Sequence, residues 1–122
     1  MYAGLLGIIL LVLSIRVVTV VRAKGKIGYG DGGDPDFTTV VWGQGNCVEY
    51  VPLTLILIAF AEAGGTSAFW IHAMGIALVA GRIMHPFGLT KKPGFDPLRF
   101  VGANLTWLTL LPASVFVLVN QY

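Results

Sequence analysis

The chain has 122 residues, enough for one domain, and 56% of them are hydrophobic while only 11% are charged. Soluble domains carry about 25% charged residues, so this composition excludes an ordinary water-soluble protein. The net charge of +2 comes without a basic stripe with interleaved aromatics, which argues against nucleic acid as a partner. The single Cys47 excludes an internal disulfide framework.

Four apolar segments are long enough to cross a bilayer, which takes about 20 residues. The first continues past one internal charge, Arg16, and the second contains one charge, Glu49. The third, from Ala63 to Gly81, is uncharged and ends at Arg82, and the fourth, from Phe100 to Val119, is uncharged. The sequence therefore predicts an all-α integral membrane protein, a four-transmembrane-helix bundle over residues 1–122, with helices at about 2–23, 35–62, 66–88 and 97–120.

The connections have recognisable start and turn signals. Asp34 and Asp96 each precede a proline, a pattern that predicts an N-cap followed by Pro at the first helical position. Gly64 and Gly65 lie in a short second connection, so the second and third helices are expected to form a tight hairpin.

The basic residues predict the orientation in the membrane. The first and third connections hold Arg22, Lys24, Lys26, Lys91, Lys92 and Arg99, whereas the second has none. Since cytoplasmic loops carry the excess of Lys and Arg, loops one and three should be cytoplasmic and both termini non-cytoplasmic.

The second helix carries a polar and aromatic stripe. Asn46 lies three residues before Glu49, and Trp42 and Tyr50 each lie four residues from Asn46, with Gln44 to one side. An ionised group at the centre of a membrane helix costs roughly 2.5–3.5 kcal/mol on insertion scales, so the stripe should face protein and not lipid.

A second group of ionisable residues lies toward one side of the bilayer. It comprises Arg22, Arg82, His85 and Arg99. Three guanidiniums and the Glu49 carboxylate would suit a small anionic molecule that also has an amine. For Glu49 and Arg82, a structural ion pair between adjacent helices is an interpretation of equal weight to the ligand site.

Other residues have plainer interpretations. Arg16 is predicted to snorkel or to make a packing contact, and Cys47 to be a small packing residue. His72 is expected at the outer interface. The spacing of His and Cys predicts no metal site.

Three segments together resemble the MAPEG family, the membrane-associated proteins in eicosanoid and glutathione metabolism. The stretch from Gly43 to Leu53, with its Asn-Cys-Val-Glu-Tyr-Val-Pro-Leu core, is similar to the family's second-helix signature. Residues 28–36 resemble the glycine- and aspartate-rich loop of bacterial members, and residues 81–85 resemble their Gly-Arg-x-x-His segment.

The resemblance implies a homotrimer in a bacterial inner membrane, with glutathione as co-substrate bound between neighbouring subunits from the cytoplasmic side. It implies that Arg99 is catalytic and stabilises the thiolate. The residues that it places against glutathione are Arg22, Gln44, Asn46, Glu49, Tyr50, Arg82 and His85. Trp42 stands where eukaryotic relatives have an Arg, and His85 and Leu89 stand where they have tyrosines.

The implied function is a glutathione-dependent transferase or peroxidase acting on lipophilic electrophiles or hydroperoxides. Only a thiolate is a good nucleophile, and a free thiol has a pKa near about 8.5, so a guanidinium that lowers it would activate glutathione. Membrane lipids would surround the site and deliver the lipophilic substrate. The alternative is a non-catalytic lipid-binding or scaffolding protein of the same fold, in which Trp42 fills the space of a ligand-binding Arg.

Overall fold

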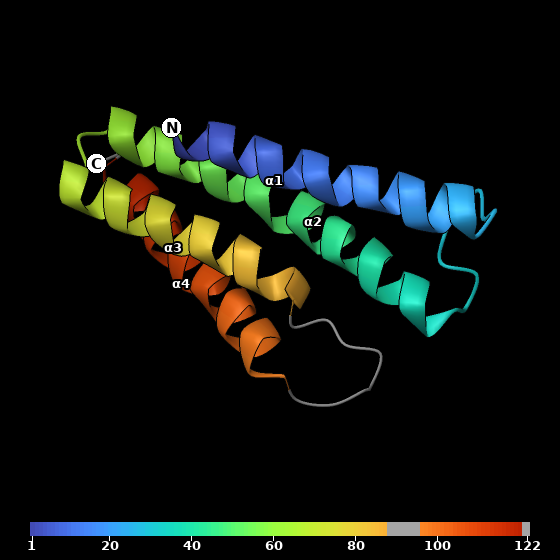
Figure 1. Ribbon diagram of the computed structural model, residues 1–122. Coiled ribbons are helices and arrows are strands. Elements are labelled where there is room, and N and C mark those ends of the chain that lie inside the picture. The colour runs from blue at the N-terminus through green and yellow to red at the C-terminus, as the bar shows by residue number, and fades with distance from the viewer. Residues whose placement is uncertain (88–95, 121–122) are drawn as a thin grey trace.

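The structure is a computed structural model that describes residues 1–87 and 96–120. It contains α1 (Tyr2–Arg16), which continues as the π-helix η1 (Val17–Lys24), followed by α2 (Pro35–Ala63), α3 (Ala68–Phe87) and α4 (Pro97–Asn120) (Figure 1). No strand occurs within these described ranges. The all-α class and the positions of the helices agree with the prediction from the sequence. Lys91 and Lys92, used above for orientation, lie outside the described residues.

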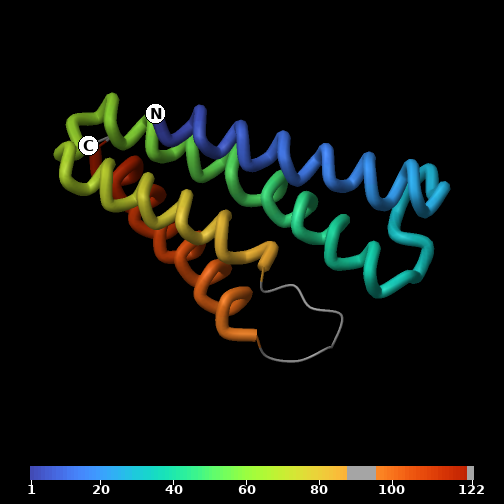
Figure 2. Tube along the Cα trace, in the orientation of Figure 1, coloured from blue at the N-terminus to red at the C-terminus, as the bar shows by residue number. Residues whose placement is uncertain are grey.

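The start of α1 and the end of α4 lie near the α2–α3 turn (Figure 2). The Asn120 side-chain amide donates to the Thr66 hydroxyl at 2.9 Å, which ties the end of α4 to that turn. The turn itself is short, and Gly65 adopts a φ of +91° that favours glycine. The predicted hairpin is therefore present. The side of the membrane that each end faces stays a prediction from the charges.

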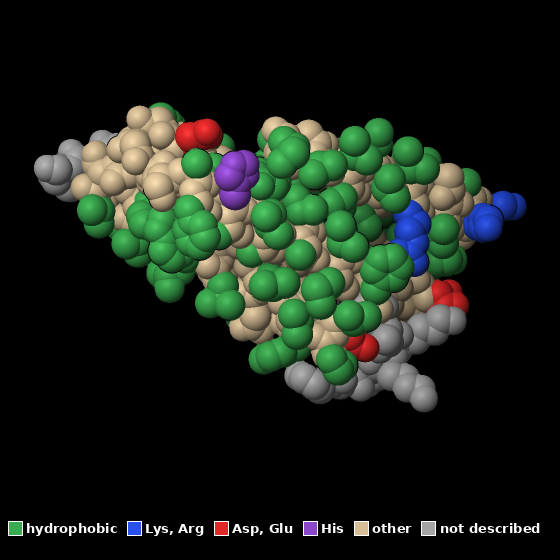
Figure 3. All heavy atoms as spheres, turned by 60° about the vertical axis from the view of Figure 1, so that its left-hand side comes forward, with side chains coloured by type: hydrophobic (Ala, Val, Ile, Leu, Met, Phe, Trp, Pro, Cys, Tyr) green, Lys and Arg blue, Asp and Glu red, His purple; other side chains and the backbone are tan. Residues whose placement is uncertain are grey.

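All four helical segments are long and apolar enough to cross a membrane. Only 22% to 39% of the most apolar stretch of each is buried within the chain. Figure 3 shows a face made mostly of hydrophobic side chains, with Lys and Arg gathered toward one end. Such a surface suits lipid or other apolar protein and not water.

The two predicted helix starts are confirmed. The Asp34 carboxylate accepts the Asp36 backbone N–H at 2.8 Å, with Pro35 at the first helical position. Asp96 accepts the N–H groups of Leu98 at 2.9 Å and Arg99 at 3.3 Å. Both caps satisfy amides that would otherwise have no partner at a helix N-terminus.

Helices α3 and α4 approach one another at two glycines. A Cβ on Gly81 would lie 2.8 Å from the Gly102 carbonyl oxygen, and one on Gly102 would lie 2.8 Å from the Gly81 oxygen. Such a close crossing is possible only without side chains at both positions.

As expected, Cys47 packs in the core and is 1% exposed.

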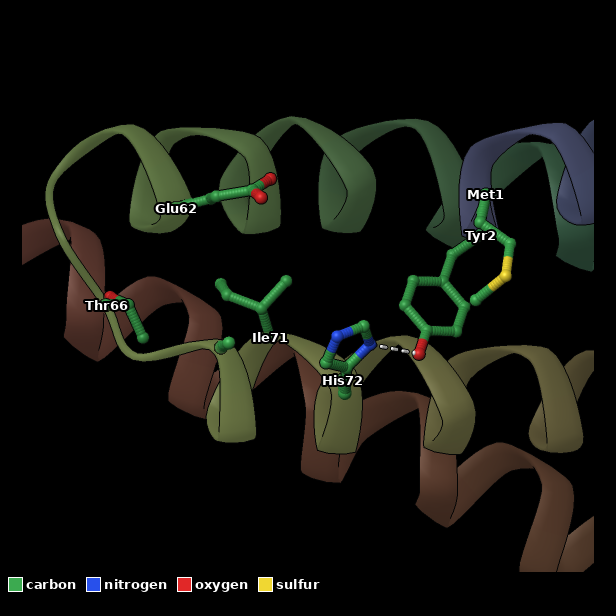
Figure 4. A pocket seen from close by; sticks show the side chains of 7 residues that line it. Met1, Tyr2, Glu62, Thr66, Ile71 and His72 are labelled. Atoms are coloured by element: carbon green, nitrogen blue, oxygen red, sulfur yellow. Dashed lines mark hydrogen bonds between the residues drawn. The ribbon is translucent and has the colours of Figure 1, made fainter.

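The end of the bundle that holds both termini is tied by a second polar contact. Tyr2 Oη and His72 Nδ1 lie 2.7 Å apart, which joins the start of α1 to α3 (Figure 4). The Tyr2 ring packs where a side chain on Gly75 would stand. His72 is thus exposed near the start of α3 and has a partner within the chain, while its place at the outer interface stays a prediction.

Candidate functional site

Arg82 lies where α2, α3 and α4 meet. Its side chain is 2% exposed, and its guanidinium donates to the Asn46 side-chain oxygen on α2. A longer contact of 3.5 Å joins it to the Gly102 carbonyl on α4, which the Gly81–Gly102 crossing brings within reach. Its Nε has no hydrogen-bond partner in the described chain. A buried guanidinium held by two neutral oxygens keeps its full charge available to an anion.

Glu49 does not pair with Arg82. Its side chain is exposed on α2, and within the described residues Arg82 contacts only neutral oxygens. The structural ion pair between these two residues, one of the two interpretations above, therefore does not form in the chain. The carboxylate is left pointing away from the helices of its own chain.

One cavity opens along the outer face of α2. It has a volume of about 310 Å³, and Trp42, Asn46 and Glu49 contribute the larger side chains of its lining. Because the Asn46 oxygen accepts from Arg82, its amide nitrogen is the donor that remains for a ligand. This cavity therefore combines a carboxylate, an amide donor and an aromatic face, which come from three of the residues of the predicted stripe.

A second cavity lies between α3 and α4. It has a volume of about 390 Å³, and its lining includes His85, Asp96, Arg99, Asn104 and Trp107. His85 is 6% exposed, and its Nδ1 has no partner in the described part of the chain. A guanidinium, an imidazole and an amide around one space can bind a carboxylate or orient a thiolate.

Sequence reasoning missed Asn104 and Trp107 in this cavity. The signal was present, because Arg99, Ala103 and Trp107 recur every four residues and so share one face of α4. The segment contains no charge after Arg99, so ionisable residues alone do not mark that face.

Arg22, Gln44 and Tyr50 line neither cavity. The Arg22 guanidinium donates to the carbonyls of Ile27 at 3.2 Å and Gly30 at 2.8 Å, so it holds the first loop against the end of η1. Gln44 and Tyr50 are half-buried on α2.

The predicted site residues therefore do not meet in one pocket of a single chain. Glu49 lines the cavity on α2, and Arg99 lines the other cavity, between α3 and α4. The contact between Arg82 and Asn46 joins α3 to α2 and involves neither the Glu49 carboxylate nor the Arg99 guanidinium.

Comparison with known proteins agrees with the four-helix fold and with the signature around Asn46 and Glu49. The model of the MAPEG family matches residues 1–119. The chain belongs to the MAPEG family. This MAPEG protein is 35% identical over 122 residues to the "Inner membrane protein YecN" of Escherichia coli strain K12, covering 100% of the chain and 88% of the relative. The protein of that name in E. coli strain CFT073 matches with the same identity and coverage. As a MAPEG protein with four apolar helices, the chain is an integral membrane protein.

Proposed function

We propose that this protein is a glutathione-dependent transferase or peroxidase of a bacterial inner membrane that works as a homotrimer. The observation that carries the proposal is the position of Glu49, an exposed carboxylate halfway along a membrane-length helix. It lies 14 residues after Pro35 in a 29-residue helix, which is about 21 Å along the helix axis from the first residue of α2.

A carboxylate at that depth facing lipid costs roughly 2.5–3.5 kcal/mol. No basic side chain of the described chain pairs with it, so a partner from outside the chain is needed to offset the cost. The α-amine of glutathione is a cation of suitable size, and its two carboxylates would pair with guanidiniums, that of Arg82 among them. A neighbouring subunit would close the open side of the cavity on α2.

The reaction needs little beyond an activated thiol. Arg99 would stabilise the glutathione thiolate as the proton leaves to solvent. The sulfur would then attack an electrophilic carbon, form the C–S bond and expel the leaving group with its electron pair. In the peroxidase reaction, two glutathiones would reduce a hydroperoxide to alcohol and water and become the disulfide. Arg82 and Asn46 would position the tripeptide, with His85 beside Arg99.

Conjugation of chlorodinitrobenzene by detergent-purified protein in the presence of glutathione tests this proposal. Wild type is expected to be active, Arg99→Ala to lose at least about 100-fold in rate, as for other removed charge-stabilising groups, and Lys24→Ala to match wild type. Reduction of cumene hydroperoxide with glutathione covers the peroxidase reaction. Wild type and Arg99→Ala that are both folded, trimeric and inactive with both substrates would overturn the enzymatic function.

One observation favours a second candidate, a non-catalytic lipid-binding or scaffolding protein. Trp42 is 65% exposed and lines the same cavity as Asn46 and Glu49. An indole beside the carboxylate makes this cavity better suited to an amphiphile than an Arg would. Calorimetric titration separates the two candidates, because heat with an amphiphile and none with glutathione would favour the second.

A further inference from the structure

A groove runs between α1 and α3 and shares no lining residue with the two cavities described above. Its volume is about 230 Å³. We propose that it binds an anionic phospholipid, with the phosphate against Arg16 and one acyl chain along the helices. This inference is independent of glutathione.

The walls of the groove suit an acyl chain. On α1, Ile8 and Val12 are spaced by four residues, and on α3 so are Ile83 and Phe87. All four side chains are exposed, with exposed fractions between 49% and 75%. Two parallel apolar rows of this kind form a furrow along the helix axes that holds one chain, while a second chain can stay in the bilayer.

The head of the groove carries positive charge without a counterion. Arg16 continues the spacing of Ile8 and Val12, and in the described ranges no side chain pairs with its guanidinium. Arg82 is also among the residues that line the groove, and its buried Nε has no hydrogen-bond partner in the described part of the chain. A planar guanidinium matches a phosphate with two parallel hydrogen bonds, which makes an anionic head group the complementary ligand.

Along α1, the charged Arg16 lies nearer the basic end of the bundle than the apolar residues of the groove. A phospholipid in one leaflet has the same order, with its phosphate at the surface and its acyl chains toward the bilayer centre. Arg16 lies six residues before Arg22, or about 9 Å deeper than the basic end of the bundle. Ile8 lies a further 12 Å or so toward the middle of the helix. A phospholipid whose phosphate reaches Arg16 would therefore direct its chain past Val12 and Ile8 to the bilayer centre.

Native mass spectrometry of the detergent-purified protein tests the proposal. Phosphatidylglycerol and phosphatidylcholine with identical acyl chains are titrated separately, and phosphatidylglycerol is expected to be retained more tightly. Arg16→Gln should lower its affinity about tenfold, as expected for loss of a charge-assisted hydrogen bond. The matched control Lys24→Gln removes the same charge from an exposed position outside the groove and should cost less than about fivefold.

A second pair of variants tests occupation of the groove without changing the charge of the protein. Val12→Trp fills the groove, whereas Val18→Trp adds the same ring at a position that is equally exposed, 58% against 57%, outside it. Only Val12→Trp should reduce retention of phosphatidylglycerol.

Three results would overturn the proposal. The first is equal retention of the two phospholipids, or equal losses for Arg16→Gln and Lys24→Gln. The second is displacement of phosphatidylglycerol by an equimolar free fatty acid, which would assign the groove to a carboxylate. The third is a change in subunit number caused by Val12→Trp alone, which would make this face a contact between copies of the chain.

Discussion

The guanidinium of Arg82 on α3 donates to the side-chain oxygen of Asn46 on α2. The two residues are 36 positions apart, and each was predicted to contact a ligand. Asn46 therefore has two roles, because it accepts a hydrogen bond from a buried guanidinium and also lines the cavity that contains Glu49. Substitutions at Asn46 should therefore change stability as well as binding.

Asn46→Ala should lower the free energy of unfolding by about 1–2 kcal/mol, because it leaves a buried guanidinium with one weak contact. Chemical unfolding in detergent micelles measures this change. Gln44→Ala is the control, because Gln44 is half-buried on the same helix and has no side-chain hydrogen bond in the described chain. Equal stability of the two variants would mean that the Asn46–Arg82 contact contributes nothing.

Gly81→Ala should destabilise the bundle by about 1–3 kcal/mol, as overpacking does elsewhere. The new methyl group would stand 2.8 Å from the Gly102 carbonyl oxygen and force α3 and α4 apart. Gly7→Ala is the matched control, because nothing lies within 4 Å of a Cβ at that position. The unfolding midpoints of the two variants give the comparison, and a Gly81→Ala protein as stable as Gly7→Ala would contradict the close crossing.

Arg22→Ala should loosen the first loop, because it removes both hydrogen bonds that Nη1 of Arg22 donates to the carbonyls of Ile27 and Gly30. Amide hydrogen exchange across residues 27–34 is expected to speed up about tenfold, in line with the loss of hydrogen bonds to a charged group. Lys24→Ala should leave exchange unchanged. If Arg22→Ala instead weakened glutathione binding with no change in exchange, Arg22 would serve the ligand and not the loop.

Thr38→Val should raise the pKa of Asp31. The Thr38 hydroxyl donates to the Asp31 carboxylate at 2.6 Å and the Gly33 N–H at 2.8 Å, and together they hold the pKa of Asp31 below its ordinary value of 3.8. A depressed pKa in the folded state stabilises the loop above pH 3.8, and this contribution is lost as the pH falls through the folded value. Thr38→Val should reduce that acid-side dependence.

Carboxyl NMR titration of Asp31 measures this shift. Thr39→Val is the control, because the Thr39 hydroxyl donates to the Asp36 carbonyl and not to Asp31. An Asp31 pKa that is the same in both variants would assign its depression to backbone hydrogen bonds, that of Gly33 first, and not to Thr38.

The helices and their caps could be predicted because the causes lie close together in the sequence. Hydropathy depends on about 20 consecutive residues, and the bonds from Asp34 and Asp96 span two or three positions. The change to π-helical hydrogen bonding at Val17 was not predicted, since the residues of η1 include no Gly or Pro that would signal it.

The candidate site was predicted in its residue types and only partly in its arrangement. The spacing of Asn46 and Glu49 placed both on one face of a helix, and both line the cavity on α2. Of the two interpretations left open for Glu49 and Arg82, the structural ion pair does not form within the chain, because the side chain of α2 that reaches Arg82 depends on how α2 is rotated about its axis. The spacing of residues within one helix does not predict how that helix is rotated relative to its neighbours.

The sequence by itself determined that this is a four-helix membrane protein of the MAPEG family, because hydropathy, caps and the second-helix signature are local properties of the chain. Only the tertiary structure decided that Arg82 binds Asn46, that Glu49 points outward and that a groove with Arg16 at its head separates α1 from α3. The physical reason is that contacts between helices depend on their rotation and closest approach, which here the backbone contact of Gly81 with Gly102 helps to fix.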